Sequence, residues 1–323
     1  MANTFKVKTN AAMPASAGTP LTIYTCPSST QTIIVGLLLM ISMLPLSIMT
    51  LPQAILAWWL GNNYPQEKRT IIIVHGINSS KKHYNQLMPA TMLANAGFNV
   101  LMFDQRNHGD SSCPSGRYFA GTREWEDLNT VIDWLIEAKK IDAKNIGIHA
   151  VSGGTLATQF LMAERSDIPA FSLDSPVFDF EEIVKSELKW NGIPPIIWRL
   201  AVFMGKLHGI DIYAKSPKDG IQRIGDRAIM VMHGTDDTRV PFLHSERLVK
   251  YASSLGKEVK FIVNDQVDVS KIINADGCHL GQNDSPVVQA KKNLKKKIIG
   301  VTCHNSIKLA KKASLDGADY IAL

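Results

Sequence analysis

Ser152 lies in the segment GIHAVSGG, residues 147–154, between an apolar run and a helical pattern. A serine hydroxyl becomes a nucleophile when a base takes its proton and donors stabilise the oxyanion that forms. A tight strand-to-helix turn exposes such a hydroxyl, and it requires small residues two positions before and two after the serine. Ala150 and Gly154 occupy those positions. The spacing predicts a nucleophile at Ser152, with the backbone N–H of Gly153 as an oxyanion donor.

Two further strand ends supply candidate partners. His75 and Gly76 end the first buried run, which places the amide of Ile77 as a second oxyanion donor. The segment HGTDDTRVP, residues 233–241, ends a later run, and a carboxylate there can orient a histidine. Asp237 and Asp236 are both candidates for this acid. Asp174, at the end of another run, is a structural cap or a substitute acid.

The general base is missing from its expected place. It should be a histidine in the loop shortly after the run that ends near Val263, and no histidine stands there. His244 follows Asp237 too closely and is expected to start a helix. His279 and His304 lie in a tail of different character, and His279 is the candidate for a substitute base.

The elements that must position these residues alternate between strand and helix. Continuous apolar runs predict strands buried on both faces, typical of a parallel sheet covered by helices. The expected strands are 70–75, 99–104, 146–151, 170–174, 228–233 and 259–263, and the expected helices are 84–96, 124–140, 155–164 and 244–255. The order predicts an α/β fold with a doubly wound, mostly parallel sheet, whose sites lie at the carboxyl ends of the strands.

Residues 70–260 resemble the α/β-hydrolase family, especially its membrane-anchored serine-hydrolase branch. The shared strand-end motifs are HG, D-x-R-x-HG-x-S, G-x-S-x-G and HG-x-x-D-x-x-VP, with Ala150 in place of the usual glycine. The resemblance implies that Ser152 is the nucleophile, Asp237 the acid, and Ile77 and Gly153 the oxyanion amides. It also favours Asp237 over Asp236, and it implies hydrolysis of an ester, thioester or amide of a small acyl substrate, without a cofactor.

The tail, residues 261–323, alternates strand and helix again and resembles a middle portion of thiamine-phosphate synthase, a (β/α)8 barrel. The shared motifs are VND, G-x-HLGQ-x-D and IIGV-[ST]-x-H-N. By this resemblance Asp265 and Asp284 would bind Mg²⁺, while Asn264 and Thr302 would bind a pyrophosphate. Gln266 replaces an arginine common in that family.

The tail is expected to be a partial barrel fragment. Its few strands cannot close an eight-stranded barrel, so synthase activity from this chain alone is not expected, and Mg²⁺ matters only if the fragment functions. The join falls within residues 257–263, which indicates a gene fusion, a rearranged gene or an artefact of sequence assembly. The alternatives to a hydrolase are therefore a thiamine-biosynthetic fragment and a catalytically silent fusion.

The N-terminal part contains a long apolar segment. Residues 33–60 carry no charged side chain and are long enough to span a bilayer, although Pro45 and Pro52 would kink the helix. We expect an N-terminal tail at 1–32 and a transmembrane anchor at 33–60; an apolar arm packed on the soluble domain is the alternative. The hydrolase-like domain is expected at 68–260, with an apolar cap at about 178–215, and the synthase-like units at 261–323.

Composition sets the remaining expectations. The formal net charge of +6 comes largely from lysine clusters near residues 291–297 and 311–312, which suit solvated helix faces. No recognition motif supports a nucleic-acid partner. The four cysteines are widely scattered, which predicts reduced thiols and neither a disulfide framework nor a zinc site. A membrane-anchored protein with its soluble domain in the cytoplasm is the expectation.

Overall fold

The computed structural model describes residues 4–9, 54–60, 69–303 and 306–322. The strands are β1 (Thr4–Thr9), β2 (Ala54–Leu60), β3 (Thr70–Val74), β4 (Asn99–Phe103), β5 (Ile146–Val151), β6 (Ala170–Asp174), β7 (Ala228–Gly234), β8 (Lys260–Asn264), β9 (Gly277–Leu280), β10 (Ile298–Thr302) and β11 (Tyr320–Ala322). The α-helices are α2 (Tyr84–Asn95), α3 (Glu124–Glu137), α4 (Gly154–Glu164), α5 (Phe180–Trp190), α6 (Trp198–Leu207), α7 (Pro217–Gln222), α8 (Leu243–Ser254), α9 (Val267–Ile272), α10 (Val287–Leu294) and α11 (Ile307–Leu315). Short 3₁₀ turns occupy Ala143–Asn145 and Pro195–Ile197.

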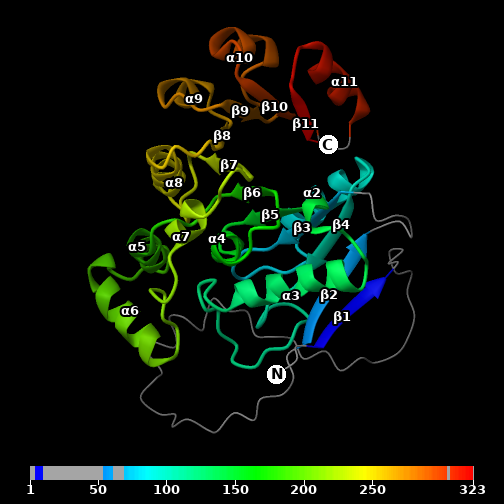
Figure 1. Ribbon diagram of the computed structural model, residues 1–323. Coiled ribbons are helices and arrows are strands. Elements are labelled where there is room, and N and C mark those ends of the chain that lie inside the picture. Colours follow the sequence, from blue (N-terminus) through cyan, green and yellow to red (C-terminus); the bar gives the residue numbers. More distant parts are fainter. Residues whose placement is uncertain (1–3, 10–53, 61–68, 304–305, 323) are drawn as a thin grey trace.

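All described strands join one sheet in the order β1-β2-β4-β3-β5-β6-β7-β8-β9-β10-β11 (Figure 1). Within the described residues, the pairing of β2 with β4 is antiparallel and the other pairings are parallel. The expected mostly parallel sheet of an α/β-hydrolase-like fold is confirmed. Its carboxyl ends from β3 to β8 meet along one edge, which is where the candidate site lies.

Different helices cover the two faces of the sheet, because the chain reverses its direction across the strand order after β4. The chain passes from β3 to β4 in one direction and from β5 onward in the other, and right-handed crossovers then place the intervening helices on opposite faces. Helix α2 packs its Ala90 against Ile73, Val100 and Met102 on one face. The main core lies on the other face, where α3 buries a stripe of apolar residues at helical spacing: Leu128, Val131, Ile132 and Leu135.

Beyond α2, the first face of the sheet forms a groove of about 1070 Å³. Side chains of β5 to β9 line it, among them His149, Ser172, Met230, Ile262 and His279. These side chains alternate with the residues that face the main core, as the period of a strand requires.

The C-terminal tail continues the same sheet. Strands β9, β10 and β11 extend the row beyond β8, and Figure 1 shows them leading to the edge that carries the C terminus. Their helices build a second core around Cys278, Leu280, Ile299 and Val301. Parallel pairing of β9 with β8 joins the tail to this open sheet, so the expected partial barrel is not confirmed.

Residues 54–60 correct part of the expected transmembrane anchor. They form β2, which pairs with β4 and alternates its exposure so that Ile55, Ala57 and Trp59 enter the core. The ring of Trp59 meets that of Trp134 edge to face at 6.4 Å. The rest of the expected anchor, 33–53, and the expected tail from 10 onward lie outside the described residues. Among the helices that are described, none has the length and apolarity needed to cross a bilayer.

The cysteines depart from expectation at one position. Cys278 and Cys303 are buried free thiols, and burial raises the pKa of both. Cys113 is disulfide-bonded, so the expectation of reduced thiols throughout is wrong.

Candidate active site

Ser152 occupies a strained turn between β5 and α4. Its φ of 50° is in the left-handed region, which costs a residue other than glycine roughly 1–3 kcal/mol. The N–H of Ser152 donates to the carbonyl of Asp174 on the neighbouring strand at 2.8 Å, which fixes the turn to the sheet. Ser152 is half-buried, and it lines an apolar cavity.

Small residues around the serine are required by close backbone approach. A Cβ on Gly154 would lie 2.5 Å from the carbonyl oxygen of His75, so a side chain there would displace β3 or α4. A Cβ on Gly76 would lie 3.1 Å from the Cβ of Ser152. Ala150, which stands in place of the usual glycine, is fully buried.

The two expected oxyanion amides come together beside the serine. The position of a Cβ on Gly153 would be 3.1 Å from the backbone nitrogen of Ile77. The hydroxyl of Tyr118 donates to the carbonyl of Gly153 at 2.7 Å and so holds this peptide in place. Two backbone N–H groups on adjoining loops can stabilise a developing oxyanion without reorganisation.

Asp237 is held as a carboxylate in the loop after β7. Its Oδ1 accepts the N–H groups of Arg239 and Val240, both at 2.9 Å, and its Oδ2 lies 3.7 Å from Nε2 of His233. Burial, the largest influence, raises the pKa of Asp237, but the contact with His233 and the two backbone donors outweigh it and leave the pKa below its ordinary value. The side chain is thus ionised near neutral pH.

The alternative acids have other partners. Asp236 is exposed, and its carboxylate oxygens lie 3.4 Å from the side-chain nitrogen of Gln266. Asp174 accepts a hydrogen bond from the hydroxyl of Ser175 at 3.2 Å, and burial raises its pKa. Its carboxyl group belongs to the groove side of the sheet, together with His149.

His279 lies far from Ser152. It is on β9, four strand positions from β5, which corresponds to roughly 19 Å at about 4.8 Å per strand. Its Nδ1 is hydrogen-bonded to the hydroxyl of Tyr320 at 2.9 Å, and its Nε2 to that of Thr302 at 2.7 Å. The expectation that His279 could replace the base is therefore wrong on distance.

His244 and His233 also have structural partners. Nδ1 of His244 accepts the N–H groups of Phe178 and Asp179, both at 3.1 Å, and burial lowers its pKa to about 4. His233 is bonded to the hydroxyl of Ser245 and the carbonyl of Val240. Within the described part of the chain, no histidine lines the cavity beside Ser152. His304 lies outside the described residues.

The connection between β8 and α9 is too short to bring a base to Ser152. Strand β8 ends at Asn264 and α9 begins at Val267, so only Asp265 and Gln266 connect them. Strand β8 lies three positions from β5, or roughly 14 Å. A two-residue connection cannot carry any side chain back to Ser152 across that distance.

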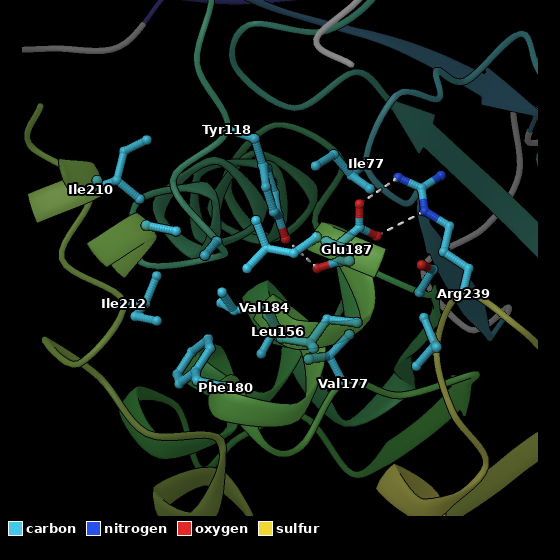
Figure 2. Close-up of a pocket in the computed structure, with 18 of the residues that line it drawn as sticks. Ile77, Tyr118, Leu156, Val177, Phe180, Val184, Glu187, Ile210, Ile212 and Arg239 are labelled. Atoms are coloured by element: carbon cyan, nitrogen blue, oxygen red, sulfur yellow. Dashed lines mark hydrogen bonds and ion pairs between the residues drawn. The ribbon is translucent and has the colours of Figure 1, made fainter. Parts of the chain in front are cut away.

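An apolar cavity of about 190 Å³ opens beside Ser152 (Figure 2). Helices α5 and α6, inside the expected cap, form one wall, and α4 and the loop of Tyr118 form the other. Its apolar lining includes Leu156, Val177, Phe180, Val184, Val202, Ile210 and Ile212. Glu187 and Arg239 also line it and form an ion pair, with Nε of Arg239 2.8 Å from Oε1 of Glu187.

The residues expected to bind Mg²⁺ and pyrophosphate lie at the carboxyl end of the tail strands. Asp265 and Asp284 both lie beside Gly281, and partial burial of Asp265, reinforced by the neighbouring carboxyl group of Asp284, raises the pKa of Asp265 to about 6. Asn264 ends β8, and the Thr302 hydroxyl is bonded to His279. Two adjacent carboxylates suit Mg²⁺ that keeps water and phosphate as its other ligands. Larger groups of metal-binding side chains are absent from the described residues.

Sequence reasoning missed three residues that shape the site. Tyr118 braces Gly153, and Glu187 and Arg239 form the ion pair of the cavity. Arg239 lies inside the HGTDDTRVP motif, which could have drawn attention to it. Tyr118 and Glu187 have no such signal, because their contacts join segments far apart in the chain.

A mostly parallel sheet with a positive-φ serine between β5 and α4, beside the backbone of Ile77 and Gly153, is typical of the α/β-hydrolase class. The sequence profile of the prolyl oligopeptidase family matches residues 86–268, more than half of the chain. The chain therefore belongs to the prolyl oligopeptidase family. The profile of thiamine monophosphate synthase matches residues 244–323 and overlaps the first at its end.

Individual relatives divide the chain in the same way. The thiamine-phosphate synthase of Pelagibacter ubique is 65% identical over 65 residues, which is 20% of this chain and 31% of that protein. The chain thus spans about a third of the length of the synthases that it matches. The protein YqkD of Bacillus subtilis is 31% identical over 206 residues, covering 61% of this chain and 63% of that one.

Solved structures share the fold. The esterase Pf2001 of Pyrococcus furiosus superimposes with a TM-score of 0.50 and 22% identity, covering 64% of this chain and 75% of that one. Est1E of Butyrivibrio proteoclasticus, with ferulic acid bound, gives a TM-score of 0.51 and 19% identity over 68% of this chain and 88% of that one.

Proposed function

We propose that this chain is a serine hydrolase of small acyl substrates whose turnover is impaired by the lack of a base. The observation that carries the proposal is the strained turn at Ser152, beside the amides of Ile77 and Gly153 at an apolar cavity. Backbone strain of this kind persists only where the surrounding structure imposes it, and it exposes the hydroxyl. The substrate is an ester, a thioester or an amide.

The reaction follows from the placement of these groups. The Ser152 oxygen attacks the carbonyl carbon, and the π electron pair of the carbonyl moves to the carbonyl oxygen. The N–H groups of Ile77 and Gly153 donate hydrogen bonds to the resulting oxyanion. The serine proton passes to solvent water. Collapse of the intermediate expels the alcohol, thiol or amine, which takes up a proton from water, and leaves an ester on Ser152. Water then hydrolyses this ester slowly, because no base activates it.

Asp237 has the proposed role of the acid member, retained without a histidine to orient. Its carboxylate is held by Arg239 and Val240 in the loop after β7. In this state it braces the loop that carries Arg239 to the cavity. It does not contribute proton transfer, since a carboxylate in a triad acts through the histidine.

Labelling with a fluorophosphonate probe tests the proposal. Folded protein should be labelled, and Ser152→Ala should abolish the label. Ser175→Ala is a matched control, because Ser175 also ends a strand and also has a φ of 50°. Absence of label on folded wild-type protein, or label that survives Ser152→Ala, would refute the nucleophile.

A second candidate function rests on the tail. The neighbouring carboxyl groups of Asp265 and Asp284 lie within the segment similar to thiamine-phosphate synthase, and they favour binding of a magnesium pyrophosphate, with Asn264 and Thr302 toward the phosphate oxygens. Calorimetry with pyrophosphate should detect binding that requires Mg²⁺ and is lost in Asp265→Ala. Binding that is equal without Mg²⁺ would refute this function.

A further inference from the structure

The cavity beside Ser152 is apolar along its length. Figure 2 shows Ile210 and Ile212 at the end opposite Ile77, the residue next to the serine loop. Phe180 and Val184 of α5 and Leu156 of α4 lie between these ends. A group attached to a carbonyl at Ser152 would therefore extend between the helices toward Ile210.

The polar side chains of the lining are engaged with one another or with the backbone. Glu187 and Arg239 neutralise each other, with their side chains each 29% exposed. The Tyr118 hydroxyl donates to Gly153, and the Asn191 side chain donates to the carbonyl of Glu187 at 2.7 Å. In the part of the chain that is described, the inner end of the cavity thus offers no uncommitted charge to a polar substituent.

The size of the cavity limits its occupant. An apolar cavity of about 150 Å³ binds benzene, so a volume of about 190 Å³ holds an apolar group of roughly six to eight carbons. A longer chain exceeds this volume.

We propose that this cavity is an acyl-chain site that accepts a saturated, uncharged chain of six to eight carbons and excludes longer ones. The inference rests on the proposed function for the identity of the reacting carbonyl, but chain binding itself needs no nucleophile. Gly205 of α6 sets the length limit, because it lines the cavity next to Ile210.

Gly205 provides a variant that shortens the site without disturbing the fold. A Cβ there would meet the nearest atom, the carbonyl oxygen of Ile210, at 3.6 Å, which is ordinary contact distance. Leucine is also a better helix former than glycine. Gly205→Leu should therefore fold and fill the inner end of the cavity. Lys206→Leu is the matched control, since the neighbouring Lys206 side chain is 67% exposed and does not line the cavity.

Calorimetric titration with 1-butanol, 1-hexanol, 1-octanol and 1-decanol measures chain binding without any reaction at Ser152. Affinity should rise about fourfold per methylene up to octanol and then stop rising. Gly205→Leu should weaken octanol binding at least tenfold and change butanol binding less than twofold, while Lys206→Leu leaves both unchanged. If Gly205→Leu unfolds, Val184→Trp on α5 serves as a second cavity-filling variant.

The outcomes separate this inference from the proposed function. Chain-length dependence that Gly205→Leu truncates supports the acyl-chain site, even if the fluorophosphonate does not label Ser152. An alcohol affinity that does not depend on chain length, or that continues to rise through decanol, contradicts the acyl-chain site even where Ser152 is labelled. Octanol binding that both Gly205→Leu and Val184→Trp leave intact also overturns it.

Discussion

Glu124→Gln should make the stability of this protein less dependent on pH. Glu124 begins α3 and is fully buried, and its Oε1 accepts the N–H of Phe119 at 2.8 Å. Among the described residues, its other carboxylate oxygen has no hydrogen-bond partner. Burial, reinforced by the charge of Asp127, raises the pKa of Glu124 to about 7 from an ordinary 4.5. The residue also fixes the loop whose Tyr118 braces the candidate oxyanion site.

The sign and size follow from linkage. Between pH 4.5 and 7 the unfolded chain loses the proton of Glu124 while the folded chain keeps it, so stability from this group falls as pH rises. A shift from 4.5 to about 7, at about 1.4 kcal/mol per pH unit, corresponds to about 3 kcal/mol. Glutamine resembles the protonated acid at every pH. The difference in free energy of unfolding, variant minus wild type, should therefore increase by about 3 kcal/mol between pH 4.5 and pH 8.

Urea unfolding at a series of pH values measures this difference. The depressed pKa values of His75 and His244, both about 4, remove stability from wild type and variant alike as pH falls from 6.5, so they cancel. Glu137→Gln, at the exposed end of the same helix, is the control for removing a carboxylate from this helix. A constant difference for Glu124→Gln, or one that grows toward low pH, would refute the reasoning.

Three further variants test the packing and the missing base. Gly154→Ala places a Cβ 2.5 Å from a backbone oxygen and should lower the free energy of unfolding by about 1–3 kcal/mol in thermal or urea unfolding. Gly234→Ala, with open space around the added Cβ, should change the free energy of unfolding by less than about 0.5 kcal/mol. Equal effects of the two substitutions would contradict the clash at Gly154. Asp127→Ala leaves the buried guanidinium of Arg106 without its main partner and should cost about 3–5 kcal/mol in urea unfolding; a loss below about 1 kcal/mol would show that the pair is not buried as described. Gln266→His should not restore ester turnover, because its two-residue connection lies roughly 14 Å from the serine strand; p-nitrophenyl butyrate hydrolysis above the wild-type rate would show that the loop reaches further.

Much of the fold followed from local sequence pattern. Short continuous apolar runs marked strands buried on both faces, and the runs at Thr70, Asn99 and Ile146 became neighbouring strands β3, β4 and β5. The small residues around Ser152 predicted the strand-to-helix turn, because only small side chains permit the close backbone approach at Gly154. Strand ends carried the candidate acids and amides, since parallel strands bring their carboxyl ends to one edge.

The sequence pattern did not predict the structure of segments that pair with strands far away in the sequence. Ala54–Leu60 looked like the end of a membrane span, but its pairing with β4 makes it a strand, and apolarity alone does not distinguish the two. The tail carries barrel motifs, yet the free edge of β8 draws β9 into the same open sheet.

By itself, then, the sequence determined the alternating α/β order, the strand-to-helix turn at Ser152 and the absence of a histidine directly after β8, because each depends on neighbouring residues. Only the tertiary structure decided that His279 is four strands away, that Tyr118 braces Gly153, and that Glu187 and Arg239 pair at an apolar cavity. Those relations join segments far apart in the chain, and the packing of helices on the sheet sets their distances.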